Sequence, residues 1–188
     1  MNFLIGLFVA ASYYVGIKSI FQNKYYPSIY SRVVWLLLSV NAFASVVALK
    51  NSFSVILLAG LGLFGSSIVL ILSLRKSKKT FGPTELIASL LLIISLGIWL
   101  FTKLPLLNLS IGLLAHFIGG IPTYKKVFED PKDEDILFWL FFAVASALAF
   151  LGADKSQLSG YLYPLYLVIF EFGMTFLCLR RYMNVKSR

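Results

Sequence analysis

Long apolar runs alternate with short polar connections along the whole chain. Each run is close to the roughly 17–25 residues that a helix needs to cross a bilayer. Because backbone amides find no water in lipid, such runs are expected to be helices. Seven spans are predicted: Asn2–Ile17, which continues toward Phe21, Val33–Leu49, Phe53–Leu74, Glu85–Phe101, Pro105–Ile121, Ile136–Gly152 and Ser159–Leu179.

The composition is that of a membrane protein. Of the 188 residues, 59% are hydrophobic and 13% are charged, whereas soluble domains have about 45–50% apolar and about 25% charged residues. A chain of this size hides only about 70% of its surface on folding, so the excess apolar surface must meet lipid. This excludes a soluble enzyme, a disulfide-stapled secreted domain and a disordered chain. The first run has no basic segment before it and no small-residue cleavage site, so it is expected to be a retained span.

The 17 lysines and arginines outnumber the 8 acidic residues and gather in alternate connections. Cytoplasmic connections carry the excess of Lys and Arg, which predicts an N-terminus outside and a C-terminus in the cytoplasm, in the cell (inner) membrane. Cations in short gaps do not form a basic face, so no nucleic-acid partner is expected. The basic connections and the tail hold Lys18, Lys24, Arg32, Arg75, Lys76, Lys78, Lys79, Lys125, Lys126, Lys132, Arg180, Arg181, Lys186 and Arg188, and the other connections hold Lys50, Lys103 and Lys155.

Segments of the first half of the chain recur at a shift of about 105 residues. The matched segments begin at Trp35 and Trp139, at Leu72 and Leu177, and at Lys18 and Lys125. Spans one to three therefore look duplicated as spans five to seven, and span four restores their orientation. The predicted fold is an all-α integral membrane protein with seven transmembrane helices, arranged as two parallel three-helix bundles joined by a linker helix (3+1+3). The predicted units are residues 1–79, 80–104 and 105–188, the last with the basic cytoplasmic tail.

This arrangement resembles that of the SWEET sugar transporters and their PQ-loop relatives. The stretch Gly119-Gly-Ile-Pro-Thr-Tyr-Lys-Lys126, followed by Pro131, Glu134 and Trp139, looks like the proline motif at the cytoplasmic end of a repeat's first helix. Pro122-Thr123 stands in place of Pro-Gln, and Val15-Gly16 of the first repeat lacks the proline. The stretch Tyr163-Pro-Leu-Tyr166 also looks like little-characterised bacterial members. The resemblance implies a transporter fold and, because half-size members dimerise, leaves a homo-oligomer open.

Two ionisable residues lie inside predicted spans, where such residues are functional hypotheses by default because they are costly to bury. At 1.5 Å per residue, Glu171 is expected about 12 Å deep from the cytoplasmic end of span seven, and His116 roughly 7–8 Å deep in span five. An imidazole–carboxylate pair between these spans could exchange protons as a gate moves. The alternatives are a buried structural hydrogen bond, or a Glu171 that is kept protonated by desolvation.

Four further residues are candidates for solute binding. Asn41 in span two and Ser146 in span six are polar residues at similar depth. Asn41 either joins helices, at about 1 kcal/mol, or binds a solute hydroxyl. The repeat-matched Trp35 and Trp139 belong either to an aromatic belt at the cytoplasmic interface or to a pair of rings that stack on a solute.

Pro122 is the predicted mechanical residue. A proline inside a helix removes an amide and kinks the helix, and beside Gly119 and Gly120 it would form a hinge for alternating access. The alternative is that span five ends there. Farther along, Asp130 and Pro131 suit the N-cap and the first position of the next helix.

Other chemistries find little support. Gly60-Leu-Gly-Leu-Phe-Gly65 fits a dinucleotide-binding pattern but lies inside a span with no strand before it, and its glycines are more typical of close helix packing. One His and one Cys, Cys178, cannot form a zinc site. No spacing typical of a nucleophile and its base occurs. We therefore expect no enzyme, no metal and no cofactor.

Two functions remain. The first is a small-solute transporter or facilitator, for a sugar or vitamin-like metabolite, that works by alternating access and has the lipid bilayer and a small polar solute as partners. The second is a non-transporting membrane subunit, or a structural or signalling partner of another complex. The duplicated bundle favours the first, and the sparse polar residues favour the second.

Overall fold

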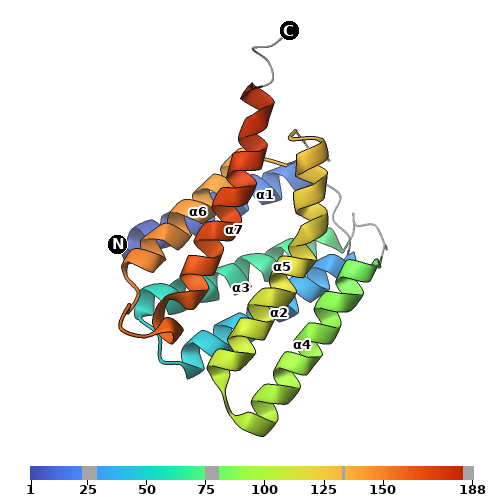
Figure 1. The fold of residues 1–188 in the computed structure, drawn as a ribbon. Helices are drawn as coiled ribbons and strands as arrows, with labels where there is room; N and C mark the ends of the chain where they lie inside the picture. The colour runs from blue at the N-terminus through green and yellow to red at the C-terminus, as the bar shows by residue number, and fades with distance from the viewer. Residues whose placement is uncertain (23–28, 75–80, 133, 184–188) are drawn as a thin grey trace.

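A computed structural model describes residues 1–22, 29–74, 81–132 and 134–183, and these residues form helices and no strands (Figure 1). The prediction of an all-helical chain is therefore confirmed over the described residues. The helices are α1 (Asn2–Phe21), α2 (Ile29–Ala48), α3 (Phe53–Ser73), α4 (Pro83–Thr102), α5 (Pro105–Glu129), α6 (Ile136–Leu151) and α7 (Leu158–Met183).

Six of these helices, all except α6, are long and apolar enough to cross a membrane. Helix α6 is apolar but has 16 residues, which at 1.5 Å per residue is shorter than a hydrocarbon core of about 30 Å. The chain is thus a multi-pass membrane protein by the length and composition of six spans. The predicted sixth span, Ile136–Gly152, is an apolar helix of smaller length.

The prediction that Pro122 lies inside a helix is confirmed, and one predicted helix start is wrong. Helix α5 does not end at Ile121, the alternative, but continues through Pro122 to Glu129, because a proline removes a single amide and the turns on either side retain their hydrogen bonds. Asp130 caps the C-terminus of α5 instead of starting the next helix. The N-cap of α6 is Asp135, whose carboxylate accepts a hydrogen bond from the Leu137 amide at 3.0 Å.

The described cations lie near the two ends of the helices. Lys18, Lys126 and Arg180 mark the end of the bundle where α1, α5 and α7 finish, which we call the basic end. Lys50 and Lys103 lie in the tight turns at the opposite end, with φ of 53° and 57°. Outside the described residues lie Lys24, Arg75, Lys76, Lys78, Lys79, Lys186 and Arg188, together with the side chain of Arg181.

Several pairs of helices pack against one another. Helix α3 contacts α1 and α2, and α7 contacts α5 and α6. Between these groups α1 contacts α6, and α2 contacts α5. Helix α4 lies at the edge of the molecule against α5 and α2 (Figure 1).

A tyrosine makes the same contact in each half of the chain. The Tyr13 hydroxyl on α1 donates to the Gly62 carbonyl on α3 at 2.8 Å, and its ring lies against Gly65. The Tyr124 hydroxyl on α5 donates to the Phe170 carbonyl on α7 at 2.5 Å, and its ring lies against Gly173. In both cases the glycine follows the bonded carbonyl by three residues, so that the ring fits over the next turn of the helix.

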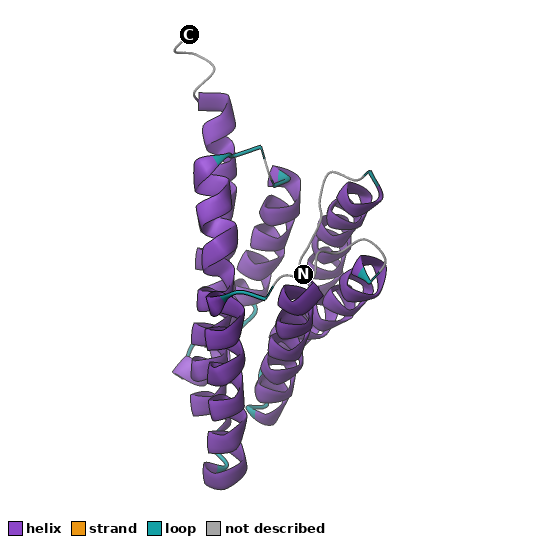
Figure 2. Cartoon of the chain, turned by 90° about the vertical axis from the view of Figure 1, so that its right-hand side faces the viewer, coloured by secondary structure: helices purple, strands orange, loops and turns teal. Residues whose placement is uncertain are grey.

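An apolar cluster joins the helices at the end opposite the basic end. Figure 2 shows the helices diverging from this end toward the end that carries the C-terminus. We call the cluster the apolar seal, and its buried members are Ile5, Val9, Val46, Val55, Leu58, Ala59, Leu109, Leu113, Phe142, Ala145, Ala149, Tyr163 and Leu167.

Replacing Gly65 by Ala is expected to lower the free energy of unfolding by about 1–3 kcal/mol, as overpacking does. The new Cβ would overlap the Tyr13 ring, which the hydrogen bond to Gly62 holds in place. The matched control is Gly97→Ala in α4, where a Cβ meets nothing within 4 Å. Thermal unfolding of the purified variants measures both. Equal midpoints for the two variants would contradict the close approach of α1 and α3.

Candidate functional site

A cavity of about 590 Å³ lies between the helices. Its lining reaches the surface at the basic end, where Pro122 and Lys132 are exposed. Its floor consists of members of the apolar seal, namely Leu109, Leu113, Phe142, Tyr163 and Leu167. The cavity is therefore open toward the basic end and closed by apolar packing at the other.

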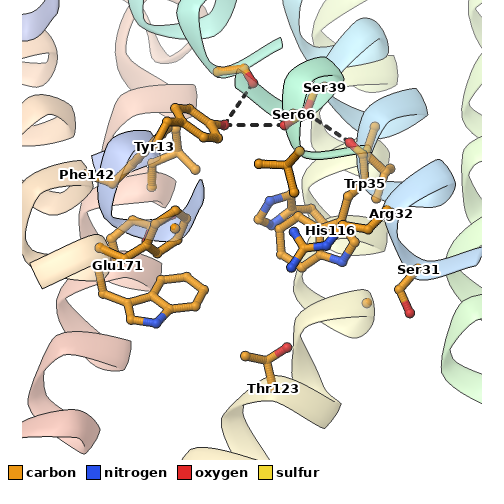
Figure 3. Close-up of a pocket in the computed structure, with 18 of the residues that line it drawn as sticks. Tyr13, Ser31, Arg32, Trp35, Ser39, Ser66, His116, Thr123, Phe142 and Glu171 are labelled. Atoms are coloured by element: carbon orange, nitrogen blue, oxygen red, sulfur yellow. Dashed lines mark hydrogen bonds between the residues drawn. The ribbon is translucent and has the colours of Figure 1, made fainter. Parts of the chain in front are cut away.

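Trp35 and His116 form one wall of this cavity (Figure 3). Their rings meet edge to face, with centroids 4.3 Å apart and planes at 71°. His116 Nδ1 also lies 2.7 Å from the Tyr166 hydroxyl of α7. The predicted approach of His116 to α7 therefore exists, but the hydrogen bond of its imidazole is to Tyr166 and not to Glu171.

Glu171 lines the opposite side of the cavity, beside Tyr13 (Figure 3). Only 6% of its surface is exposed. Its Oε2 atom is buried and has no hydrogen-bond partner among the described residues. A buried polar group is usually hydrogen-bonded, and an unpaired one costs free energy. Glu171 is therefore a buried carboxyl group at the cavity wall with an oxygen that the described residues leave without a hydrogen bond.

Asn41 has one half of its amide in a structural network and the other half at the cavity. Its Oδ1 accepts a hydrogen bond from Asn108 Nδ2 at 2.8 Å, and the same Nδ2 donates to Ser45 at 2.7 Å. Ser95 of α4 donates to the Asn108 carbonyl at 2.9 Å. The Asn41 Nδ2 atom lies against Gly112 and has no partner among the described residues. Both predicted roles of Asn41, joining helices and offering a donor, are thus compatible with its position.

The two other predicted binding residues are on α6 and differ in position. Trp139 lines the cavity, and its buried indole N–H has no hydrogen-bond partner among the described residues. Ser146 is fully buried, its hydroxyl also lacks a partner there, and it does not line the cavity. Only Trp139 of this pair is placed to touch a solute in the cavity.

The predicted hinge residues face two directions. Gly119 and Pro122 line the cavity on α5. Gly120 is buried against α7, where an added Cβ would come within 2.6 Å of the Phe170 ring. The hinge segment therefore lies between the cavity and the packed α5–α7 interface.

Three cavity residues were not predicted from the sequence. The Tyr13 hydroxyl and the Ser39 hydroxyl each lie 3.3 Å from the Ser66 hydroxyl, which links α1, α2 and α3 (Figure 3). Ser39 also donates to the Trp35 carbonyl at 2.9 Å. The hydroxyl of a serine in an apolar helix commonly donates a hydrogen bond to the backbone carbonyl four residues earlier. The serines therefore gave no clear signal in the sequence, and only their convergence on Tyr13 distinguishes them.

The charged residues at the cavity mouth have partners. Glu85 accepts a hydrogen bond from Ser31 at 2.5 Å and another from the Gly82 amide at 3.0 Å. Lys126 lies 3.4 Å from Glu134. Within the described part of the chain no three His, Cys, Asp or Glu side chains gather as a metal site requires.

Comparison of the chain with family models, with curated proteins and with solved structures finds no match.

Because the cavity opens at the basic end, two positions are expected to differ in their rate of thiol labelling. The test uses a background in which the buried Cys178 is replaced by Ala. Thr123→Cys at the mouth is expected to react at least ten times faster than Ser146→Cys with a membrane-impermeant thiol reagent. Thr123 lines the cavity, whereas Ser146 is fully buried outside it. The reagent should act from the side that the basic end faces. Equal rates would show that the cavity does not admit water.

Proposed function

We propose that this chain transports a small polar solute across a membrane by alternating access. The observation that carries the proposal is a cavity inside apolar helices that opens at the basic end and presents buried polar atoms with no partner in the part of the chain that the structure describes. These atoms are Asn41 Nδ2, Trp139 Nε1 and Glu171 Oε2. A polar solute would supply the hydrogen bonds that these atoms lack.

The proposed architecture is the 3+1+3 arrangement, with the units 1–79, 80–104 and 105–188. The paired helix contacts support it, since α1 and α3 correspond to α5 and α7, and the α1–α6 contact corresponds to that of α5 with α2. The tyrosine contacts of Tyr13 and Tyr124 repeat between the two triplets. In this proposal α6 also crosses the membrane, as the sixth of seven spans, and α4 is the linker. The same features support the resemblance to the SWEET and PQ-loop proteins.

The proposed orientation places the N-terminus outside and the C-terminus in the cytoplasm of the cell membrane. The distribution of lysine and arginine supports it. The basic end then faces the cytoplasm, and the structure corresponds to an inward-open conformation.

In the proposed cycle, the basic end closes around the solute while the apolar seal separates. Pro122 lacks the amide that would bond the Ile118 carbonyl, so α5 has a weak point where its terminal two turns can move. Gly120, packed under Phe170, keeps the earlier part of α5 against α7. Motion is then confined to the segment around the cavity mouth.

The alternative is a subunit that transports nothing. The network of Asn41, Asn108 and Ser95 favours it, because it uses buried polar groups to hold helices together. The two functions differ in whether a solute crosses the membrane.

Uptake into proteoliposomes is the test, with a radiolabelled panel of sugars, nucleosides, vitamins and amines. We expect saturable uptake of at least one solute, and we expect Glu171→Gln to reduce it at least tenfold while the variant elutes as folded protein. Glu129→Gln is the control, because Glu129 has an exposed side chain that pairs with Lys125. Folded wild-type protein that moves none of these solutes would favour the non-transporting alternative.

A second prediction concerns the hinge. Pro122→Ala is expected to slow uptake about tenfold, because the new amide can bond the Ile118 carbonyl and stiffen α5, while thermal stability stays equal or rises. Pro105→Ala is the control, since Pro105 is the first residue of α5, where a proline replaces no helical hydrogen bond. Equal uptake by both variants and the wild type would remove Pro122 from the mechanism.

A further inference from the structure

We propose that the solute is a monovalent organic cation, an amine or a quaternary ammonium compound, whose charge pairs with Glu171 and whose body lies against the aromatic lining of the cavity. This inference rests on the proposed transport function and specifies its substrate class. It begins from the carboxylates that line the cavity.

Glu171 differs from the three other described carboxylates that line the cavity. Glu85 is bonded by Ser31, Glu134 is paired with Lys126, and Asp135 caps α6. Glu171 is 6% exposed and leaves Oε2 without a partner in the described chain. A buried charge is retained at high cost unless a counter-charge or hydrogen bonds compensate it. A cationic group in the cavity would provide both.

The positive side chains of the cavity are placed away from Glu171. Lys126 and Lys132 line the mouth at the basic end, and Lys126 lies near Glu134. Arg32 lies beside Trp35 on the wall opposite Glu171 (Figure 3). A cation that passes the mouth thus finds its negative partner on the α7 side of the cavity.

The rest of the lining is rich in aromatic rings. Such rings attract cations to their faces, by about 0.5–2 kcal/mol for each well-placed ring. A cavity of about 590 Å³ is within the range of small-molecule sites, which lies at roughly 300–1,000 Å³. The aromatic residues that line it are Tyr13, Trp35, Phe138, Trp139, Phe142 and Tyr163.

A neutral sugar fits this lining less well. Its ring hydroxyls need many donors and acceptors, whereas the buried atoms without partners that line the cavity are the Asn41 and Trp139 donors and the Glu171 acceptor, among the described residues. An ammonium group needs an acceptor and aromatic faces, which Glu171 and the ring lining offer, and the Asn41 and Trp139 donors can bind an oxygen on the body of the solute. The Glu171 carboxyl group, which the described residues leave without a partner, and the aromatic area therefore favour a cation over a neutral polyol.

The test compares four probes of similar size and different charge on the purified full chain. The probes are 2-phenylethylammonium, 2-phenylethanol and phenylacetate, with phenyltrimethylammonium as a permanent cation. Equilibrium binding by calorimetry is expected to be at least tenfold tighter for both cations than for the alcohol, and weakest for phenylacetate. Glu171→Gln should lower the preference for the cations at least tenfold, and Glu171→Asp and Glu129→Gln should retain it.

The outcomes separate this inference from the proposed function. Binding without charge preference, or a preference that survives in folded Glu171→Gln, overturns the cation inference. If a neutral solute is then taken up by proteoliposomes, the transport function stands without it. Tight cation binding that depends on Glu171, with no flux of any solute, supports the inference and contradicts transport. If Glu171→Gln does not fold, two variants of Trp139 replace it in the test. The inference then predicts that Trp139→Leu loses the preference for cations and that Trp139→Phe retains it.

Discussion

The hydrocarbon interior supplies no hydrogen bonds, and this constraint governs the structure of the chain. Every apolar segment is helical because a helix satisfies its own backbone. Polar side chains in these helices must then find partners in other helices, and Asn108 does so with Asn41, Ser45 and Ser95. The same constraint makes the exceptions informative. Two buried atoms of Glu171 and Trp139 find no partner among the described residues and line one cavity, the site of the proposed solute binding.

Close helix contacts depend on small residues, because lipid provides little hydrophobic drive for helices to associate. The Tyr13 ring lies over Gly65, and the Tyr124 hydroxyl reaches the α7 backbone beside Gly173. These contacts join α1 to α3 and α5 to α7. At the far end the apolar seal fills the space with branched and aromatic side chains. The cavity thus results from tight packing at one end and divergence at the other.

Much of the fold was predictable from the sequence, because length and apolarity decide whether a segment spans a bilayer. The run from Phe53 to Leu74 and the continuation of the first run to Phe21 agree with α3 and α1.

Local signals failed at helix ends. Asp135 rather than Asp130 caps α6, since several acidic residues in that connection were equivalent by sequence. For the candidate site, the polarity of Glu171, His116 and Asn41 in apolar runs was sufficient to select them. The partners of these residues depend on rotation and depth of neighbouring helices, so Tyr166 as the partner of His116 and Asn108 as the partner of Asn41 could not be derived.

The central claim is that the cavity, once it holds a solute, closes at the basic end and opens at the apolar seal. Distances between spin labels measure this most directly, in the Cys178→Ala background. One pair at the exposed residues Phe21 and Phe128 reports on the basic end, and another at the exposed residues Phe53 and Leu158 reports on the opposite end. With a transported solute, the account predicts that the first distance shortens and the second lengthens. Two distance distributions that stay unchanged at saturating solute would contradict it.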